Sequence, residues 1–381
     1  MKKIYWRPPS LSRTALVLVA LVSVAVFVAV ESFPVVAEQR RHADKLAAAH
    51  LALEGMEAIK SRKLELGHAI DPEADPAQTG LIGESITPIT SNTGFLDAKR
   101  TSTNPNFAAI VLHLLDEAGV GEGDKVAVGV SGSFPGLNLA TYAAIAILKA
   151  DPIIIASSSS SEWGANHVDY LWLDMERTLR EEGLTPFRVA AATYGGIDDI
   201  GIGLTKAGRA MIDSAIARNG VKQLSPTSLS DAIEQRFALY QELAGAAPIE
   251  AYVNVGGGSA SVGTHVGKKQ FKAGLNVAPP SAPGVPDSVM LRFAQRDVPV
   301  IHISRVKLLA ERYGLPYGAT IARPLGQGRV FVQTEYDEWL VLGGLIVVLG
   351  AMVALLRWDV TMRVLRRGRP RADSKIPERM V

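Results

Sequence analysis

Two long apolar stretches lie near opposite ends of the chain, from Ala15 to Val30 and from Trp339 to Leu356. The first contains Ser23 as its one polar residue, and the second contains no charged residue. An α-helix rises about 1.5 Å per residue and a bilayer hydrocarbon core is about 30 Å thick, so each stretch can span a membrane with a short extension into its flanks. The pattern therefore predicts transmembrane helices at 15–36 and 336–357.

Basic residues flank both stretches on their outer sides. The segment 1–14 carries Lys and Arg without any acidic residue, and the tail 358–381 is rich in Arg. Positively charged flanks stay in the cytoplasm, so both termini are expected there and the intervening chain outside a bacterial cytoplasmic (inner) membrane. Two alternatives remain open. The first stretch resembles a signal peptide, with small residues at 35–37 for cleavage, and the second could be a buried core helix.

Between the apolar stretches, short apolar runs alternate with segments of helical spacing. Strands are expected at Lys125 to Val130, Pro152 to Ala156, Phe187 to Ala192, Ile249 to Val255 and Val298 to Ile303. Helices are expected at Phe107 to Gly119, Leu137 to Lys149, Val168 to Glu182, Lys206 to Asn219, Ser230 to Ala244, Val289 to Ala294 and Val306 to Tyr313. Buried strands separated by helices predict an α/β fold with a mainly parallel sheet and flanking helices, in an extracytoplasmic domain over 80–335.

The segment 37–79 is expected to connect the membrane to that domain. Glu38 to Leu66 has one apolar face and many charges elsewhere, which favours a helix that is either a solvated stalk or a docking surface for a partner helix. Prolines end this helix, and the polar segment from Gly80 to Asn106 follows. A polar segment of this length inside a compact domain indicates a functional loop.

The charge distribution restricts the possible partners. The formal net charge is +2, but between Glu38 and Asp337 there are 28 Lys and Arg against 33 Asp and Glu. An acidic domain does not attract nucleic acid or other polyanions by its overall field, so any anion needs a local site and no nucleic-acid partner is expected. The basic tail suits an anionic lipid bilayer. The chain has no cysteine, which excludes disulfides and thiolate chemistry.

Three predicted strands run into clusters of Gly and Ser. Backbone N–H groups freed by Gly, assisted by Ser hydroxyls, can bind a carboxylate or phosphate, and the carboxyl ends of parallel strands share one edge of the sheet. The predicted ligand-binding residues are Ser131, Gly132, Ser133, Ser159, Ser160, Gly256, Gly257, Gly258 and Ser259. Each loop by itself could be an ordinary turn. None carries a Walker or dinucleotide-binding spacing, so no nucleotide or other cofactor is expected.

The sequence supports catalytic residues less strongly than it supports ligand-binding residues. Ser131 or Ser133 at a strand-to-helix turn could act as a nucleophile paired with His265 or His167, although the Gly-x-Ser-x-Gly elbow of α/β-hydrolases is absent. The adjacent acidic residues at 198–199 could supply acid–base chemistry or form a solvated turn. The seven His residues are scattered without metal-ligand spacing, so no metal site is expected.

Three runs together resemble a known family. They are Gly80-Leu81-Ile82-Gly83-Glu84 with Thr87-Pro88-Ile89-Thr90, the run from Val128 to Asn138, and the run from Ser159 to Asn166. Together they resemble the bacterial poly-γ-glutamate system protein family. The resemblance implies an accessory protein of poly-γ-glutamate synthesis or export, with the polymer and the membrane synthase or export components as partners. It implies no catalytic residues.

Three functions follow as hypotheses. The leading one is a membrane-anchored accessory component that handles the capsule or secreted polymer outside the membrane, with the Gly/Ser crevice contacting its carboxylates. The second is an extracytoplasmic serine hydrolase or transpeptidase acting on the γ-glutamyl polymer through Ser131 or Ser133. The third is a non-catalytic scaffold for the synthase.

Overall fold

The computed structural model describes residues 13–281, 283–318 and 320–367. The chain divides into two compact units. One contains Met1–Ala37 together with Gln333–Val381, and the other contains Glu38–Val332.

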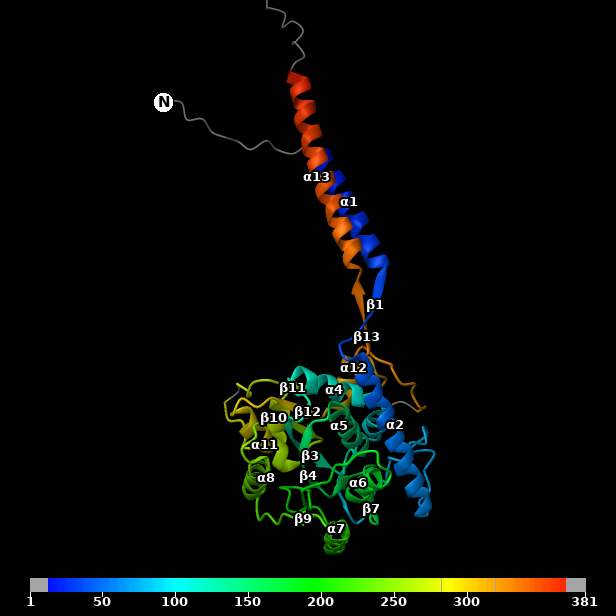
Figure 1. The fold of residues 1–381 in the computed structure, drawn as a ribbon, viewed down its shortest axis with the longest axis vertical. Helices are drawn as coiled ribbons and strands as arrows, with labels where there is room; N and C mark the ends of the chain where they lie inside the picture. The colour runs from blue at the N-terminus through cyan, green and yellow to red at the C-terminus, as the bar shows by residue number, and fades with distance from the viewer. Residues whose placement is uncertain (1–12, 282, 319, 368–381) are drawn as a thin grey trace, which may run out of the picture. The chain divides into compact units, whose positions relative to one another are not determined.

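The first unit consists of two paired helices and two short strands. Helices α1 (Arg13–Ser32) and α13 (Glu338–Arg367) lie side by side, and strands β1 (Pro34–Glu38) and β13 (Val332–Tyr336) pair (Figure 1). The helices approach closely at Gly344, where an added Cβ would stand 2.5 Å from Val26 Cγ1. Both helices are long and apolar enough to cross a membrane. The two predicted apolar helices are therefore confirmed as helices.

The second unit is built on a seven-stranded sheet. Its strands in spatial order are β11 (Gly274–Asn276), β12 (Val300–Ile303), β10 (Ile249–Val255), β3 (Lys125–Ser131), β4 (Asp151–Ser157), β8 (Ala191–Thr193) and β9 (Lys222–Gln223). All neighbours pair in parallel except β11, which runs antiparallel to β12. The predicted α/β fold with a mainly parallel sheet and flanking helices is confirmed.

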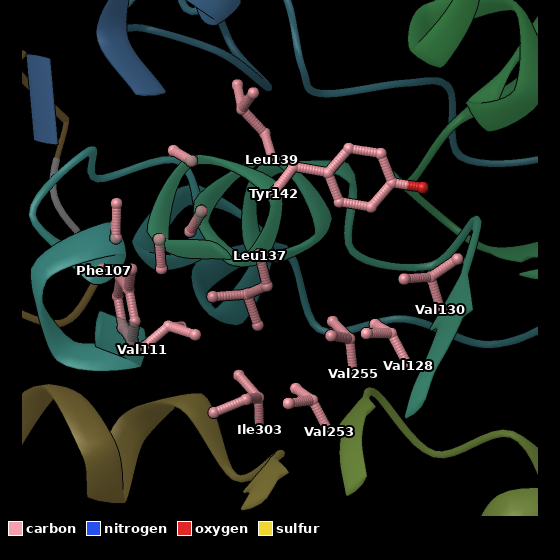
Figure 2. Close-up of a cluster of buried hydrophobic side chains, with 14 of the residues drawn as sticks. Phe107, Val111, Val128, Val130, Leu137, Leu139, Tyr142, Val253, Val255 and Ile303 are labelled. Atoms are coloured by element: carbon pink, nitrogen blue, oxygen red, sulfur yellow. The ribbon is translucent and has the colours of Figure 1, made fainter. Parts of the chain in front are cut away.

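Alternate residues of the central strands enter two separate cores, as the pleat of a strand requires. In β3, Val126, Val128 and Val130 belong to one core, whereas Ala127 belongs to the other. The first core is covered by helices that include α4 (Phe107–Glu117) and α5 (Pro135–Leu148), as Figure 2 shows around Leu137. The second core is covered by α8 (Leu229–Ala244) and α11 (Val289–Ala294).

Helix α2 (His42–Glu65), where the sequence predicts a stalk or docking helix, belongs to the same compact unit as the sheet. The helix packs against α5, α4 and α6, and four of its eight buried residues are Ala or Gly. Gly55 allows the close approach, because a Cβ there would lie 2.7 Å from Leu139 Cδ1. The apolar face expected from the sequence is thus a packing surface within this unit.

The predicted helices α6 (Trp172–Glu181), α7 (Lys206–Arg218) and α12 (Val306–Arg312) are present. Short elements that were not predicted are the helices α3 (Leu96–Ser102), α9 (Ser259–Val262) and α10 (His265–Gln270), and the strands β2 (Thr90–Asn92), β5 (Ser160–Ser161), β6 (Asn166–His167) and β7 (Tyr170–Leu171). Helix α6 begins later than expected because β6 and β7 pair as a hairpin immediately before it.

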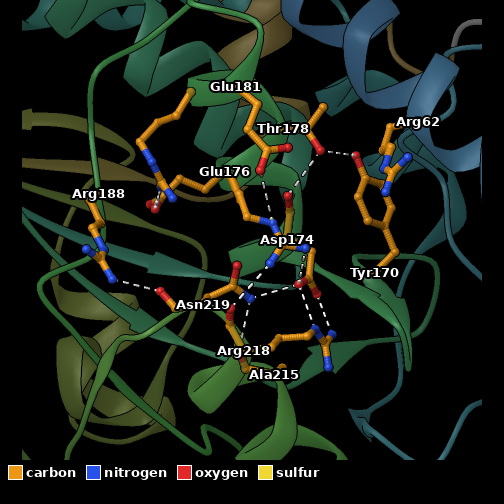
Figure 3. Close-up of polar contacts among 12 residues, drawn as sticks. Arg62, Tyr170, Asp174, Glu176, Thr178, Glu181, Arg188, Ala215, Arg218 and Asn219 are labelled. Atoms are coloured by element: carbon orange, nitrogen blue, oxygen red, sulfur yellow. Dashed lines mark hydrogen bonds and ion pairs between the residues drawn. The ribbon is translucent and has the colours of Figure 1, made fainter.

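A buried carboxylate joins α6 to α7 (Figure 3). Asp174, 1% exposed, accepts hydrogen bonds from the Leu171 N–H at 2.9 Å, from Arg218 Nε at 2.8 Å and from Asn219 Nδ2 at 2.8 Å. The first of these bonds satisfies a backbone donor at the start of α6, where helices leave such groups unpaired. Asp174 thus fixes both the beginning of one helix and its packing on the next.

The order of the strands indicates where the sheet could bind a ligand. From β3 the chain moves outward through β4, β8 and β9, and then returns to the other side of β3 to form β10 and β12. The direction of winding therefore reverses between β3 and β10. In open parallel sheets, ligands bind outside the carboxyl ends of the strands at such a switch point.

Candidate functional site

A pocket of about 200 Å³ lies at the carboxyl ends of β3, β4 and β10. The loops after these three strands all contribute to its lining, together with the segment around β2 and α3. The lining residues are Ser91, Asn92, Thr93, Gly94, Phe95, Ala98, Lys99, Ser131, Ser133, Phe134, Ser157, Ser159, Ser161, Gly196, Gly257, Gly258 and Ser259. Among the described lining residues, Lys99 has the one formally charged side chain and none has a carboxylate.

The polar segment before α4 forms one wall of the pocket. Strand β2 pairs with β5, and the Ser91 hydroxyl donates to the carbonyl of Ser160 at 3.2 Å. The Gly94 N–H donates to Glu162 Oε2 at 2.9 Å, and a Cβ at Gly94 would stand 2.4 Å from the Glu162 carbonyl oxygen. Part of the loop expected from the sequence is therefore held against the loop that follows β4.

Ser131 and Ser133 lie together at the start of the loop after β3. Asn138 from α5 donates to the Ser131 carbonyl at 2.8 Å, and the Ser131 hydroxyl donates to Ser133 Oγ at 3.2 Å. Ser133 Oγ also accepts the Ser161 N–H at 3.0 Å. Both hydroxyls therefore take part in hydrogen bonds within and between the loops.

The structure does not support pairing these serines with His167. His167 lies in β6 outside the pocket lining, with its Nδ1 3.4 Å from Glu84 Oε1 and its ring 4.4 Å from that of His68. Burial lowers the pKa of His167 to about 4, and nearby Lys63 contributes to this shift. The backbone of His265 lies in α10, and its side chain falls outside the described part of the structure.

Lys99 is the pocket residue that the sequence did not single out. Its side chain is 1% exposed, and its Nζ donates to the Ser133 carbonyl and to Ser161 Oγ, the latter at 2.7 Å. The ring of Phe134 has its centroid 4.3 Å from the same nitrogen. Burial lowers the pKa of Lys99 to about 7, partly opposed by Glu162, because a charged amine is poorly solvated in this position.

A buried ion pair lies beneath the lining residue Ser157. Asp199 Oδ2 is 2.7 Å from Arg236 Nε, and Ser157 Oγ donates to Asp199 Oδ1 at 2.9 Å. Thr193 donates to the same carboxylate oxygen at 2.8 Å. Asp199 is therefore neither a solvated turn residue nor available for acid–base chemistry in the pocket. Its role is to hold the end of β4.

The glycine loop after β10 presents backbone donors. Gly256 has φ +92°, a left-handed conformation that favours Gly, and its N–H is bonded to Ile303 at 2.9 Å. Gly257 and Gly258 follow in the pocket lining, and within the described residues their N–H groups have no hydrogen-bond acceptor. These two groups are available to a ligand.

The predicted residues divide into two groups. Ser131, Ser133, Ser159, Gly257, Gly258 and Ser259 line the common pocket. Gly132, Ser160 and Gly256 lie behind it and support its walls: Ser160 Oγ donates to the Gly132 carbonyl at 3.1 Å, and a Cβ at Gly132 would stand 2.9 Å from the Ser159 carbonyl.

Comparison with family models, curated proteins and solved structures finds no match to this chain. Within the part of the chain that the structure describes, no group of three or more His, Asp or Glu side chains is placed to hold a metal ion.

Proposed function

We propose that the protein is a membrane-anchored accessory component of poly-γ-glutamate synthesis or export, and that its pocket holds a stretch of the polymer outside the membrane. The observation that carries the proposal is the pocket at the switch point, lined by Ser and Thr hydroxyls, glycine N–H groups and one lysine, without a carboxylate side chain. The polymer itself is suggested by the resemblance of the three sequence runs.

The pocket matches the chemistry of that polymer. Each γ-linked glutamate carries a free carboxylate and a backbone amide. Hydroxyls and the unpaired N–H groups of Gly257 and Gly258 can donate to the carboxylate, and such charge-assisted hydrogen bonds are stronger than neutral ones. Because the domain is acidic overall, local donors of this kind are what an anionic chain requires.

Binding is tested with a substitution that fills the pocket. Gly258 has φ −56°, which any residue adopts, and an added Cβ would make an ordinary contact at 3.6 Å with Ser157 Oγ. We expect full-length protein in detergent to bind γ-linked glutamate oligomers in calorimetry, and Gly258→Leu to weaken binding at least tenfold because its side chain occupies the pocket.

Gly121→Leu is the matched control, because its Cβ would also meet its nearest atom, Asp124 Oδ2, at 3.6 Å, but away from the pocket. This variant should bind as the wild type does. Equal affinity of the wild type and both variants for the oligomers would contradict binding in this pocket. If none of the three proteins binds the oligomers, the scaffold hypothesis remains.

The two apolar helices and their basic flanks support the membrane-anchored part of the proposal. The chain has no cysteine, so single Cys substitutions report topology without background. We expect Glu122→Cys, whose native side chain is 73% exposed, to react with a membrane-impermeant maleimide in intact spheroplasts. Ser374→Cys, in the C-terminal tail, should react only after lysis. The reverse pattern would refute the extracytoplasmic location.

A further inference from the structure

We infer that Ser161 and Lys99 form a nucleophile and general-base pair for acyl transfer in this pocket. Lys99 Nζ lies 2.7 Å from Ser161 Oγ, within the distance at which a base can take the hydroxyl proton, and both residues line the pocket. The pair does not depend on the identity of the substrate. The assignment of a γ-glutamyl amide as the substrate rests on the proposed function.

The surroundings of Lys99 favour the neutral amine that a base must be. The side chain is buried, which disfavours its charged form. The ring of Phe134, with its centroid 4.3 Å from the nitrogen, acts in the opposite direction as a cation–π partner, and burial outweighs it. Glu162, the carboxylate that interacts with it electrostatically, is itself bonded by the Gly94 N–H. The pKa of about 7 leaves a substantial share of Lys99 unprotonated at neutral pH, as in other lysines that are activated by desolvation.

Ser161 is held in a fixed backbone position. Its N–H donates to Ser133 Oγ at 3.0 Å, and its carbonyl accepts hydrogen bonds from Ser160 Oγ at 2.7 Å and from the Gly164 N–H at 3.2 Å. Its hydroxyl is thereby kept beside Lys99. Neither Ser131 nor Ser133 has a base on its hydroxyl in this way, because Lys99 contacts Ser133 through the carbonyl. The best nucleophile is therefore a serine that the sequence analysis did not select.

The reaction follows from these positions. Lys99 takes the proton of the Ser161 hydroxyl while Oγ forms a bond to the carbonyl carbon of an amide or ester. The protonated Lys99 returns the proton to the leaving nitrogen or oxygen as its bond to carbon breaks, which leaves an acyl-serine. Water, or an amine in a transfer reaction, then releases the acyl group by the same proton exchange. The N–H groups of Gly257 and Gly258 are the available donors for the oxyanion.

A fluorophosphonate probe tests the pair directly, because an activated serine displaces fluoride from phosphorus and retains the phosphonyl group. We expect full-length protein in detergent to be labelled on Ser161, as mapped by peptide mass spectrometry, with a rate that rises with pH through a midpoint near 7. Lys99→Met should slow labelling at least 100-fold, and Ser161→Ala should abolish it. Lys307→Met, which lies outside the pocket, should be labelled as the wild type is.

Several outcomes would overturn the inference. They are the absence of label, label on another serine, and a rate that does not depend on pH near 7. A rate unchanged by Lys99→Met would do the same, and if that variant fails to fold, the pH profile of the wild type decides alone. Labelling of Ser161 in a protein that binds no γ-linked glutamate would support the pair while refuting the proposed function.

Discussion

The free energy of unfolding should rise between about pH 7 and pH 10.5, and the part of this rise that comes from Lys99 should disappear in Lys99→Met. The pKa of this lysine is about 7 in the folded protein against 10.5 for a free side chain. In this pH range the unfolded chain holds a proton that the folded chain has released, so raising the pH favours the folded state. Below about pH 7 the group is charged in both states, and its unfavourable burial is felt in full.

The expected size is large for a single group. With about 1.4 kcal/mol for each tenfold change in proton affinity, the whole effect of Lys99 amounts to about 4 to 5 kcal/mol. The measurement is urea unfolding of the full chain in detergent at a series of pH values, followed by tryptophan fluorescence. Burial also lowers the pKa of Lys45 and Lys63, so the quantity to compare is the difference between Lys99→Met and wild type. A difference that stays constant with pH would show that Lys99 is not held in the neutral form.

Removing the buried positive charge of Arg236 should lower the free energy of unfolding by about as much as the effect of Lys99. Arg236→Met is expected to lower the free energy of unfolding by about 3 to 5 kcal/mol, because it leaves Asp199 buried without its partner. The two side chains are 2% and 1% exposed, and Arg236 also donates to Ser157 Oγ at 2.9 Å and to Thr193 Oγ1 at 2.8 Å. Urea unfolding at pH 7 measures the loss.

The double variant Asp199→Asn with Arg236→Met is the informative control. It removes both charges, so it should recover part of the stability lost in Arg236→Met alone. If the single and double variants were equally destabilised, packing rather than an uncompensated carboxylate would explain the loss. The double variant also tests the pocket, since Ser157 loses its charged acceptor.

The central sheet could be predicted from the sequence because its strands are buried on both faces. Strand β10 has the predicted ends, β3 extends one residue beyond its predicted C-terminal end, and β4 extends one residue beyond its prediction at each end. The convergence of the loops after these strands followed from the parallel arrangement. Strands β8 and β9 were predicted poorly or not at all because they have three and two residues, too few for a pattern to be visible.

Lys99 could not have been found in this way. It lies in a short helix inside a polar segment, and its partners Ser133 and Ser161 are 34 and 62 residues away in the chain. Only the folded structure shows that its ammonium group is buried. The sequence predicts a functional loop before α4 but not which of its residues lines the pocket.

The pairing of the two terminal helices has a thermodynamic consequence for the segment between them. In a chain without cysteine, α1 and α13 join the beginning and the end of Glu38–Val332, as a crosslink would. While this pair remains associated, the unfolded segment is a closed ring with fewer conformations than a free chain, and closing a ring of that length removes several kcal/mol of entropy from the denatured ensemble. The paired apolar helices thus stabilise the folded segment between them by restricting its unfolded state, in addition to any role as membrane anchors.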